Sequence, residues 1–291
     1  MSKAIVKAGY VCNNNCIFCH SNPKKRYDLC SLRDIERKVK KLHDNGIKEI
    51  YVSGGEPLID KNILNIIEII KKQGMRFGLI SNLRMLSNKK LANELAGKGL
   101  SYVHTTLLGP NSRIHDAITR TPGSFNQTIR GIKNTLNNKI RMDINCVVIK
   151  QNINFLKEIV SLASDIGVKS LRFSFVEPIT SEDKHVPRIS LAARRIEEAI
   201  KNSKSGIKIG FDSIPLCLSA SYDSYRENLI TKNIGYISEC YETEIFPADY
   251  GNKIKPKRCI SCKRRNECEG VFEKYIEIYG DKELKPFNKA D

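Results

Sequence analysis

The stretch GYVCNNNCIFCH, residues 9–20, decides the fold prediction because it places three cysteines within eight positions. Three residues separate Cys12 from Cys16, and two separate Cys16 from Cys19. Three thiols cannot all pair, and a reducing cytosol disfavours disulfides. The spacing therefore indicates a metal or cluster site. A zinc ion would need a fourth ligand such as His20, whereas an iron–sulfur cluster held by three cysteines would keep one iron open to another ligand.

Two further motifs follow apolar strand candidates. Residues 51–59 read YVSGGEPLI, and glycines at a strand end let the backbone approach a ligand closely. The alternative is an ordinary turn between a strand and a helix. Residues 77–83 read FGLISNL, in which Ser81 and Asn82 end the next strand candidate. Each motif thus places polar or backbone groups at a strand's carboxyl end.

Short β-rich runs alternate with longer amphipathic runs, which is typical of parallel βα units. The expected strands are Ala4–Val11, Ile47–Val52, Arg76–Ser81, Ser101–Leu107, Arg141–Ile149 and Ser170–Val176. The expected helices are Ser31–Asn45, Lys61–Gln73, Ser87–Gly97, Phe125–Asn137, Asn154–Ile166 and Leu191–Asn202. Six such units predict an α/β fold, a partial barrel of the TIM type. Ligands of such folds bind at the carboxyl ends of the strands.

The cysteine motif after the first strand and the GGEP motif after the second resemble the signature of the radical S-adenosylmethionine (SAM) superfamily. The resemblance implies a (β/α)6 partial barrel in which Cys12, Cys16 and Cys19 hold a [4Fe-4S] cluster and SAM chelates the fourth iron. Phe18 matches the aromatic residue that usually precedes the last cysteine. Cofactor contacts are then expected at Gly54, Gly55, Glu56, Pro57, Ser81, Asn82 and Asn145.

Later strand ends carry other polar residues that could face SAM or a substrate, because alternating positions of a barrel strand point inward. The alternative is that they satisfy buried backbone groups. These residues are His104, Thr106, Asn145, Lys150, Arg172, Ser174 and Glu177. Cys146, flanked by apolar residues, is interpreted as a small buried hydrophobe. Cys30, beside the possible helix N-cap Ser31, is interpreted as structural.

Five cysteines lie in the last quarter of the chain, at positions 217, 240, 259, 262 and 268. Cys259, Cys262 and Cys268 have ligand spacing, because two cysteines separated by two residues can grip one metal from a tight turn. The fourth ligand could be Cys217 or Cys240. Spacing alone does not separate zinc from iron–sulfur here.

This cysteine pattern resembles part of the SPASM domain, or its shortened twitch relative, which bind auxiliary [4Fe-4S] clusters. Gly235-x4-Cys240 resembles an upstream SPASM element, but Phe272 stands where a further cysteine is expected. The resemblance implies one auxiliary cluster, held by Cys217, Cys259, Cys262 and Cys268, with Cys240 as a competing ligand. The expected domains are a core at 1–210 and an auxiliary-cluster domain at 211–291.

The formal net charge is +17, and seven of the thirteen residues from Lys253 to Arg265 are Lys or Arg. Such a run could attract an acidic peptide, a phosphorylated metabolite or RNA. It could also offset the negative charge of a cluster or reflect a lysine-rich genome. No apolar run is long enough to span a membrane, and MSKAIVKAGY lacks the features of a signal peptide. We therefore expect a cytoplasmic protein that does not bind membranes.

The resemblance implies an enzyme that reductively cleaves SAM and abstracts hydrogen from a peptide or small-metabolite substrate. It also implies an electron donor such as a flavodoxin or ferredoxin. One alternative is a radical SAM enzyme that modifies RNA, although no RNA-binding module is recognisable. A more remote alternative is a non-catalytic zinc-binding interaction protein.

Overall fold

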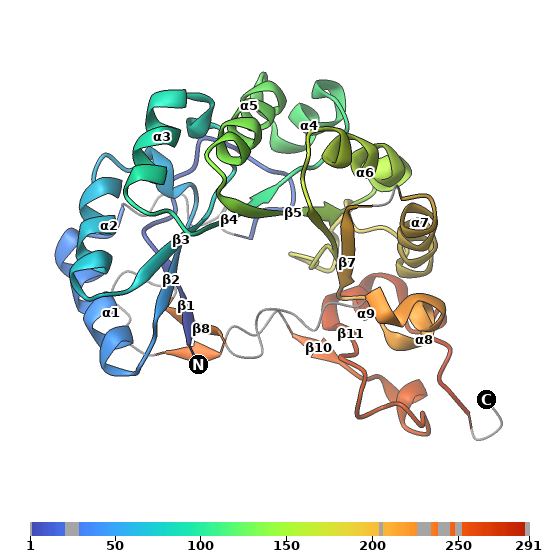
Figure 1. The fold of residues 1–291 in the computed structure, drawn as a ribbon. Coiled ribbons are helices and arrows are strands. Elements are labelled where there is room, and N and C mark those ends of the chain that lie inside the picture. The colour runs from blue at the N-terminus through green and yellow to red at the C-terminus, as the bar shows by residue number, and fades with distance from the viewer. Residues whose placement is uncertain are drawn as a thin grey trace.

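The computed structural model describes residues 2–20, 29–203, 206–225, 234–237, 245–247 and 252–288. Its main feature is a curved sheet that bends into an open arc with helices on the outside (Figure 1). The strands lie in the order β7-β6-β5-β4-β3-β2-β1-β8-β9. Neighbours from β1 to β7 are parallel, so their carboxyl ends meet at one rim. This arrangement confirms the predicted partial barrel.

The strands of the sheet are β1 (Lys3–Lys7), β2 (Glu49–Ser53), β3 (Arg76–Ile80), β4 (Tyr102–Thr106), β5 (Arg141–Val148), β6 (Ser170–Phe175), β7 (Lys208–Asp212), β8 (Ile234–Ile237) and β9 (Phe246–Pro247). The six predicted strands are β1 to β6. The seventh parallel strand, β7, was not predicted. It crosses residue 210, where we expected the core domain to end, so that division stays a prediction.

The helices are α1 (Leu32–Asp44), α2 (Ile63–Lys72), α3 (Lys89–Gly97), α4 (Ser112–Thr119), α5 (Ser124–Asn137), α6 (Leu156–Asp165), α7 (Ile189–Lys201), α8 (Leu216–Ser219) and α9 (Glu273–Tyr279). Short 3-10 turns lie at η2 (Pro57–Ile59), η3 (Met85–Ser87), η4 (Ile153–Phe155), η5 (Ala220–Tyr225) and η7 (Lys257–Cys259). The six predicted helices are present, with ends shifted by up to two residues.

Helix α1 illustrates why these segments are helical and where they pack. Ile35, Val39 and Leu42 recur on one face and are fully buried against the sheet. The hydroxyl of Ser31 accepts a hydrogen bond of 3.1 Å from the backbone N–H of Asp34, as expected of an N-cap. The outer face of the sheet and the inner faces of its helices form the main hydrophobic core.

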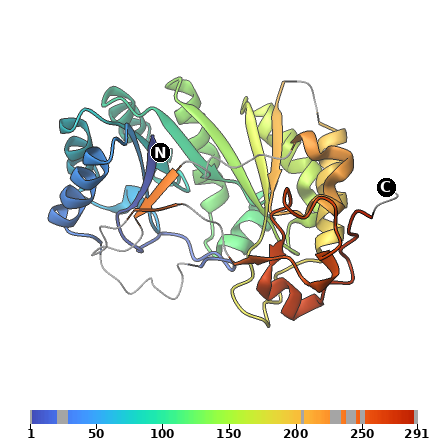
Figure 2. The ribbon, with the colours of Figure 1, turned by 90° about the horizontal axis from the view of Figure 1, so that it is seen from below.

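The last part of the chain returns to both edges of the arc. β8 pairs in parallel with β1, whereas β10 (Lys253–Ile254) and β11 (Val271–Phe272) form a separate antiparallel pair. Figure 2 shows this pair and α9 near β7 and α8, far from the amino terminus. The hydroxyl of Tyr275 in α9 accepts a hydrogen bond of 2.9 Å from the backbone N–H of Ile189. None of the helices in the described ranges is both long and apolar enough to cross a membrane.

Candidate cluster and cofactor sites

The three cysteines of residues 9–20 lie in a loop that leaves the carboxyl end of β1. All three side chains are half-buried. The loop rests on the last turn of α4, because the N–H groups of Asn15 and Ile17 donate to the carbonyls of residues 119 and 118 at 2.9 and 3.0 Å. Helix α4 was not predicted, so its role in supporting this loop could not be expected. The loop leaves the thiols at the rim where the strands end.

Gly54 and Gly55 lie directly against the backbone of the cysteine loop. The Gly55 N–H donates to the carbonyl of Gly9 at 3.0 Å. A Cβ at Gly54 would lie 2.2 Å from the Gly9 oxygen, and one at Gly55 would lie 2.2 Å from the Val11 oxygen. Gly54 also has φ of +142°, a conformation that side chains disfavour. The glycines are therefore required by close packing against the loop, whatever they also contact.

The carboxylate of Glu56 is buried and points to the turn after β3. Its Oε1 accepts hydrogen bonds from the backbone N–H of Leu58 at 3.0 Å and from the hydroxyl of Ser81 at 2.7 Å. Its Oε2 accepts one from the N–H of Asn82 at 2.7 Å. Burial raises the pKa of Glu56 to about 7, although these hydrogen bonds act in the opposite direction. Pro57, the next residue, is also buried and starts η2.

Asn82 links the turn after β3 to the cysteine loop. Its side-chain N–H₂ group donates to the Asn13 side-chain oxygen at 2.7 Å and lies 3.9 Å from the Cys12 sulfur. The carbonyl of Asn82 accepts a hydrogen bond of 3.0 Å from the hydroxyl of Thr128 on α5. The predicted cofactor residues Glu56, Ser81 and Asn82 are thus connected to Cys12 by a continuous chain of hydrogen bonds.

Arg84 is a residue of this site that sequence reasoning missed. Its guanidinium donates to the side-chain oxygen of Asn14 at 2.9 Å and to the carbonyl of Asn13, both between Cys12 and Cys16. Its Nε donates to Gln127 of α5 at 2.7 Å. The only sequence signal was a basic residue three positions beyond the expected strand Arg76–Ser81. Arg84 therefore holds the cysteine loop from the side of α5.

The inside of the barrel is lined by a second, charged network. His104 of β4 contacts Asp143 of β5 at 2.7 Å, and Arg172 of β6 lies 3.4 Å from Asp212 of β7. Burial opposes ionisation of Asp143, but the hydrogen bond from His104 and nearby positive charge lower its pKa overall. The hydroxyl of Ser174 lies 2.7 Å from both Asp212 and Asn145.

Three other predicted residues lie outside this network. Thr106 pairs with Asn145 across the ends of β4 and β5. The ammonium of Lys150 lies 5.9 Å from the centre of the Tyr279 ring. Glu177 accepts a contact of 3.1 Å at its carbonyl from His20, the residue considered as a zinc ligand. Asp143 of β5 and Asp212 of β7 were not among the residues predicted from the sequence, although both lie at inward-facing positions of their strands.

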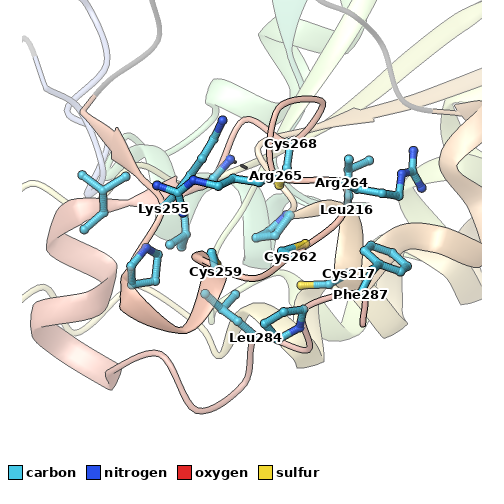
Figure 3. Close-up of a pocket in the computed structure, with 16 residues that line it drawn as sticks. Leu216, Cys217, Lys255, Cys259, Cys262, Arg264, Arg265, Cys268, Leu284 and Phe287 are labelled. Atoms are coloured by element: carbon cyan, nitrogen blue, oxygen red, sulfur yellow. Dashed lines mark hydrogen bonds between the residues drawn. The ribbon is translucent and has the colours of Figure 1, made fainter. Parts of the chain in front are cut away.

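A second cluster of thiols lines one pocket in the last part of the chain. Figure 3 shows that Cys217, Cys259, Cys262 and Cys268 surround a common space, although α8 supplies the first and the segment after β10 supplies the others. Leu216, Val271, Leu284 and Phe287 give the pocket an apolar wall. The backbone N–H groups of Lys285 and Gly270 lie 3.4 Å from the sulfurs of Cys217 and Cys268.

The chemistry of these donors fits an anionic iron–sulfur group. Backbone N–H groups directed at sulfur stabilise thiolates that bind iron. Burial raises the pKa of Cys259, an effect that the positive charge of Arg265 opposes. In the described parts of the chain, no three Cys, His, Asp or Glu side chains converge closely enough to hold a single metal ion. Thiolates bind both zinc ions and iron–sulfur clusters, so the four cysteines fit either group by their chemistry.

The remaining cysteines of the chain are Cys30, Cys146 and Cys240. Cys146 is fully buried, as predicted, and burial raises the pKa of its thiol. Cys30 is buried as well. Cys240, the competing fourth ligand, lies outside the described residues. Gly235 of the upstream element lies in β8, where its backbone pairs with Ala4.

The curved parallel sheet and the cysteine loop at its rim define an α/β partial-barrel enzyme with a cofactor site at the strands' carboxyl ends. The chain belongs to the radical SAM superfamily, whose family model matches residues 6–163, slightly more than half of its length. Enzymes of this superfamily use a [4Fe-4S] cluster and SAM. The resemblance seen in the sequence is thereby confirmed, whereas the individual site residues and the auxiliary cluster stay predictions.

Curated relatives include a probable GTP 3',8-cyclase of Methanocaldococcus jannaschii, 25% identical over 284 residues, which cover 88% of this chain and 92% of the relative. Another probable GTP 3',8-cyclase, from Sulfurisphaera tokodaii, is 30% identical over 58% of this chain. That match spans 54% of the relative, and several other matches likewise span about half of the relative's length.

Among solved structures, Streptococcus suis SuiB bound to S-adenosylmethionine superposes with a TM-score of 0.69 at 16% identity. The match covers 94% of this chain and 73% of SuiB. SuiB has also been solved with its precursor peptide SuiA. At this level of identity the similarity establishes the shared fold alone.

Proposed function

We propose that this protein is a radical SAM enzyme that acts on a peptide or small metabolite with the help of one auxiliary [4Fe-4S] cluster. Cys12, Cys16 and Cys19 hold the first cluster, and Cys217, Cys259, Cys262 and Cys268 hold the auxiliary one. The observation that carries the proposal is that four cysteines from distant parts of the sequence line a single pocket. Such convergence would be unexpected of cysteines that serve only as small apolar residues.

A cluster held by Cys12, Cys16 and Cys19 would supply the electron for the reductive cleavage of SAM. The chain's own residues hold the loop that carries it. Arg84 and Asn82 bind the loop at residues 13 and 14, and Gly54 and Gly55 pack against its start at residues 9–11. Such support fixes the position of a cofactor relative to a substrate, on which selective hydrogen abstraction depends.

The charged network inside the barrel is the favoured substrate or SAM surface. His104, Asn145 and Ser174 are half-buried and line the interior below the rim. Their partners Asp143 and Arg172 are buried and hold them in place. We propose that this network binds polar groups of SAM or of the substrate and limits the access of water.

The basic run near the auxiliary site gives little support to an RNA substrate. Lys253 pairs with Glu269 at 2.7 Å, Arg258 with Asp281 at 3.5 Å, and Arg264 with Glu267 at 2.9 Å. Three of its seven positive charges are therefore paired with carboxylates within the chain. A nucleotide is the second candidate substrate. The M. jannaschii relative, a probable GTP 3',8-cyclase, is similar to this protein over most of both chains.

The test is the iron and sulfide content, with Mössbauer spectra, of anaerobically reconstituted full-length protein. We compare the wild type with a Cys12→Ala, Cys16→Ala, Cys19→Ala variant and with a Cys259→Ala, Cys262→Ala variant. Two [4Fe-4S] clusters in the wild type, falling to one in each variant, are expected. One cluster in the wild type that disappears with the first variant would remove the auxiliary cluster from the proposal.

Chemistry is tested by measuring 5'-deoxyadenosine from SAM after reduction with dithionite. The first variant should form none, whereas the second should still cleave SAM. Consumption of added GTP by the wild type would favour the nucleotide substrate over a peptide. If GTP is unchanged while 5'-deoxyadenosine forms, the nucleotide candidate is rejected.

A further inference from the structure

The pocket of the four cysteines contains a guanidinium that has no evident role in folding. Arg265 lines the pocket with Cys259, Cys262 and Cys268 (Figure 3). Its Nη1 is buried, and it is one of five side-chain atoms in the described parts of the chain that are buried without a hydrogen-bond partner. A buried charged donor without an acceptor is unfavourable, so its retention calls for an explanation.

Two neighbouring basic residues, by contrast, donate hydrogen bonds to carboxylates. Arg264 lines the same pocket, but its guanidinium donates to Glu267 at 2.9 Å and to Asp223 at 3.2 Å. Lys253 donates to Glu269 at 2.7 Å. These cations are balanced by carboxylates. The pocket that Arg265 lines contains cysteines, apolar residues and the cations Lys255 and Arg264 but, among the described residues, no carboxylate that could balance its charge.

We infer that the Arg265 guanidinium donates a hydrogen bond to the sulfur of the anionic group that the four cysteines hold, and so raises its reduction potential. The inference rests on the auxiliary cluster of the proposed function. A cluster bound by four thiolates is negatively charged and becomes more so when it is reduced. A nearby cation and hydrogen bonds to sulfur both stabilise the reduced form, most strongly where apolar walls exclude water. Arg265 is thus a positioning and tuning residue.

The experiment is a redox titration followed by electron paramagnetic resonance (EPR), made on full-length protein. The Cys12→Ala, Cys16→Ala, Cys19→Ala background leaves only the auxiliary cluster to be observed. Arg265→Gln is compared with Arg264→Gln, which removes the same charge from the adjacent residue. We expect Arg265→Gln to lower the ratio of reduced to oxidised cluster at a fixed potential about tenfold. For a one-electron couple, this corresponds to a reduction potential that is about 59 mV lower. Arg264→Gln should shift it much less.

Other outcomes distinguish the inference from the proposed function. Equal shifts in both variants, or no shift in Arg265→Gln, would overturn the role of Arg265. A background protein without any iron–sulfur signal would instead overturn the auxiliary cluster itself. If Arg265→Gln does not fold or retain iron, the wild type is labelled with guanidino-¹⁵N arginine. A ¹⁵N hyperfine coupling to the reduced auxiliary cluster is then expected, and its absence contradicts the inference.

Discussion

The hydroxyl of Ser81 donates a hydrogen bond of 2.7 Å to the buried carboxylate of Glu56, joining the turns that follow β2 and β3. The same carboxylate accepts the backbone N–H of Asn82, whose side chain reaches the loop of Cys12. Glu56 therefore connects the two turns at the carboxyl ends of β2 and β3. Glu56 is 1% exposed, so its carboxylate holds these two turns together, while its expected contact to SAM stays a prediction.

The first prediction concerns the pH dependence of stability. The native pKa of Glu56 is raised from 4.5 to about 7, so the folded state binds this proton more tightly than the unfolded state does. This contribution to stability is present below pH 4.5 and is lost as the pH rises through 7, by about 3 kcal/mol in total. Urea denaturation of the wild type and Glu56→Gln from pH 5 to 8 should show this dependence in the wild type alone. Parallel pH profiles would contradict it.

The second prediction concerns the contact between the GGEP motif and the cysteine loop. Gly55→Ala should displace the loop, because the added Cβ meets backbone oxygens of Tyr10 and Val11 that cannot rotate away. We expect a loss of at least about 2 kcal/mol in unfolding free energy and a reduced iron content of the first cluster. Both are measured by urea denaturation and iron analysis after reconstitution.

The matched control is Gly97→Ala. Gly97 is the last residue of α3, and a Cβ there meets nothing within 4 Å. Alanine also favours the helix by up to about 1 kcal/mol over glycine. Gly97→Ala should therefore be neutral or slightly stabilising, with unchanged iron content. If Gly55→Ala behaved like this control, close packing would not be the reason for the glycine.

The barrel could be predicted from sequence because its signals are local. Residues such as Val52 and Leu79 belong to short β-rich runs, each followed by an amphipathic helix that repeats its apolar face. The carboxyl ends of parallel strands share a rim, so the cysteine, GGEP and Ser81-Asn82 motifs could be expected there together. β7 was missed because KIGFD lies beyond the six expected units, although it is as long as β1 to β4.

Features that depend on tertiary packing could not be predicted in this way. Arg84 acts through Asn13 and Gln127, which approach it only after the strand and α5 have packed. The position of Cys217 beside Cys259 likewise depends on α9 and β11 packing against the barrel. The sequence supplied Cys217 and Cys240 as possible fourth ligands; Cys217 lines the pocket, whereas Cys240 lies outside the described residues, so the choice between them stays a prediction.

The third prediction concerns the buried ion pair of Arg172 and Asp212, whose side chains are each 7% exposed. Arg172→Met leaves a buried carboxylate without its cation and should cost about 3–5 kcal/mol in unfolding free energy. The double variant Arg172→Met, Asp212→Asn should cost less than the sum of the single variants. Lys201→Met, which breaks the exposed pair with Glu197, should change stability by less than about 1 kcal/mol. Additive single effects in the cycle would contradict direct coupling.

The fourth prediction concerns how α9 fastens the cysteine pocket to the barrel. The hydroxyl of Tyr275 accepts from the backbone N–H of Ile189 and donates to Glu283, and Leu284 next to it lines the pocket. Tyr275→Phe removes both hydrogen bonds and leaves a buried backbone N–H without its acceptor, a loss of about 1–3 kcal/mol. The segment 252–288 should then exchange amide hydrogens faster, while β2 and β3 keep their protection. Hydrogen exchange followed by mass spectrometry measures both regions in one experiment.

Tyr225→Phe is the control for this change, because the Tyr225 side chain is 45% exposed and its hydroxyl can bind water. It should leave exchange in both regions unchanged. Faster exchange throughout the chain in Tyr275→Phe would show that α9 stabilises the barrel as a whole. Unchanged exchange of residues 252–288 would mean that apolar contacts are sufficient to hold the pocket in place. One such contact joins Phe175 and Tyr275, whose ring centroids lie 5.8 Å apart. The expected result, local opening alone, would identify Tyr275 as the residue that couples the auxiliary pocket to the barrel.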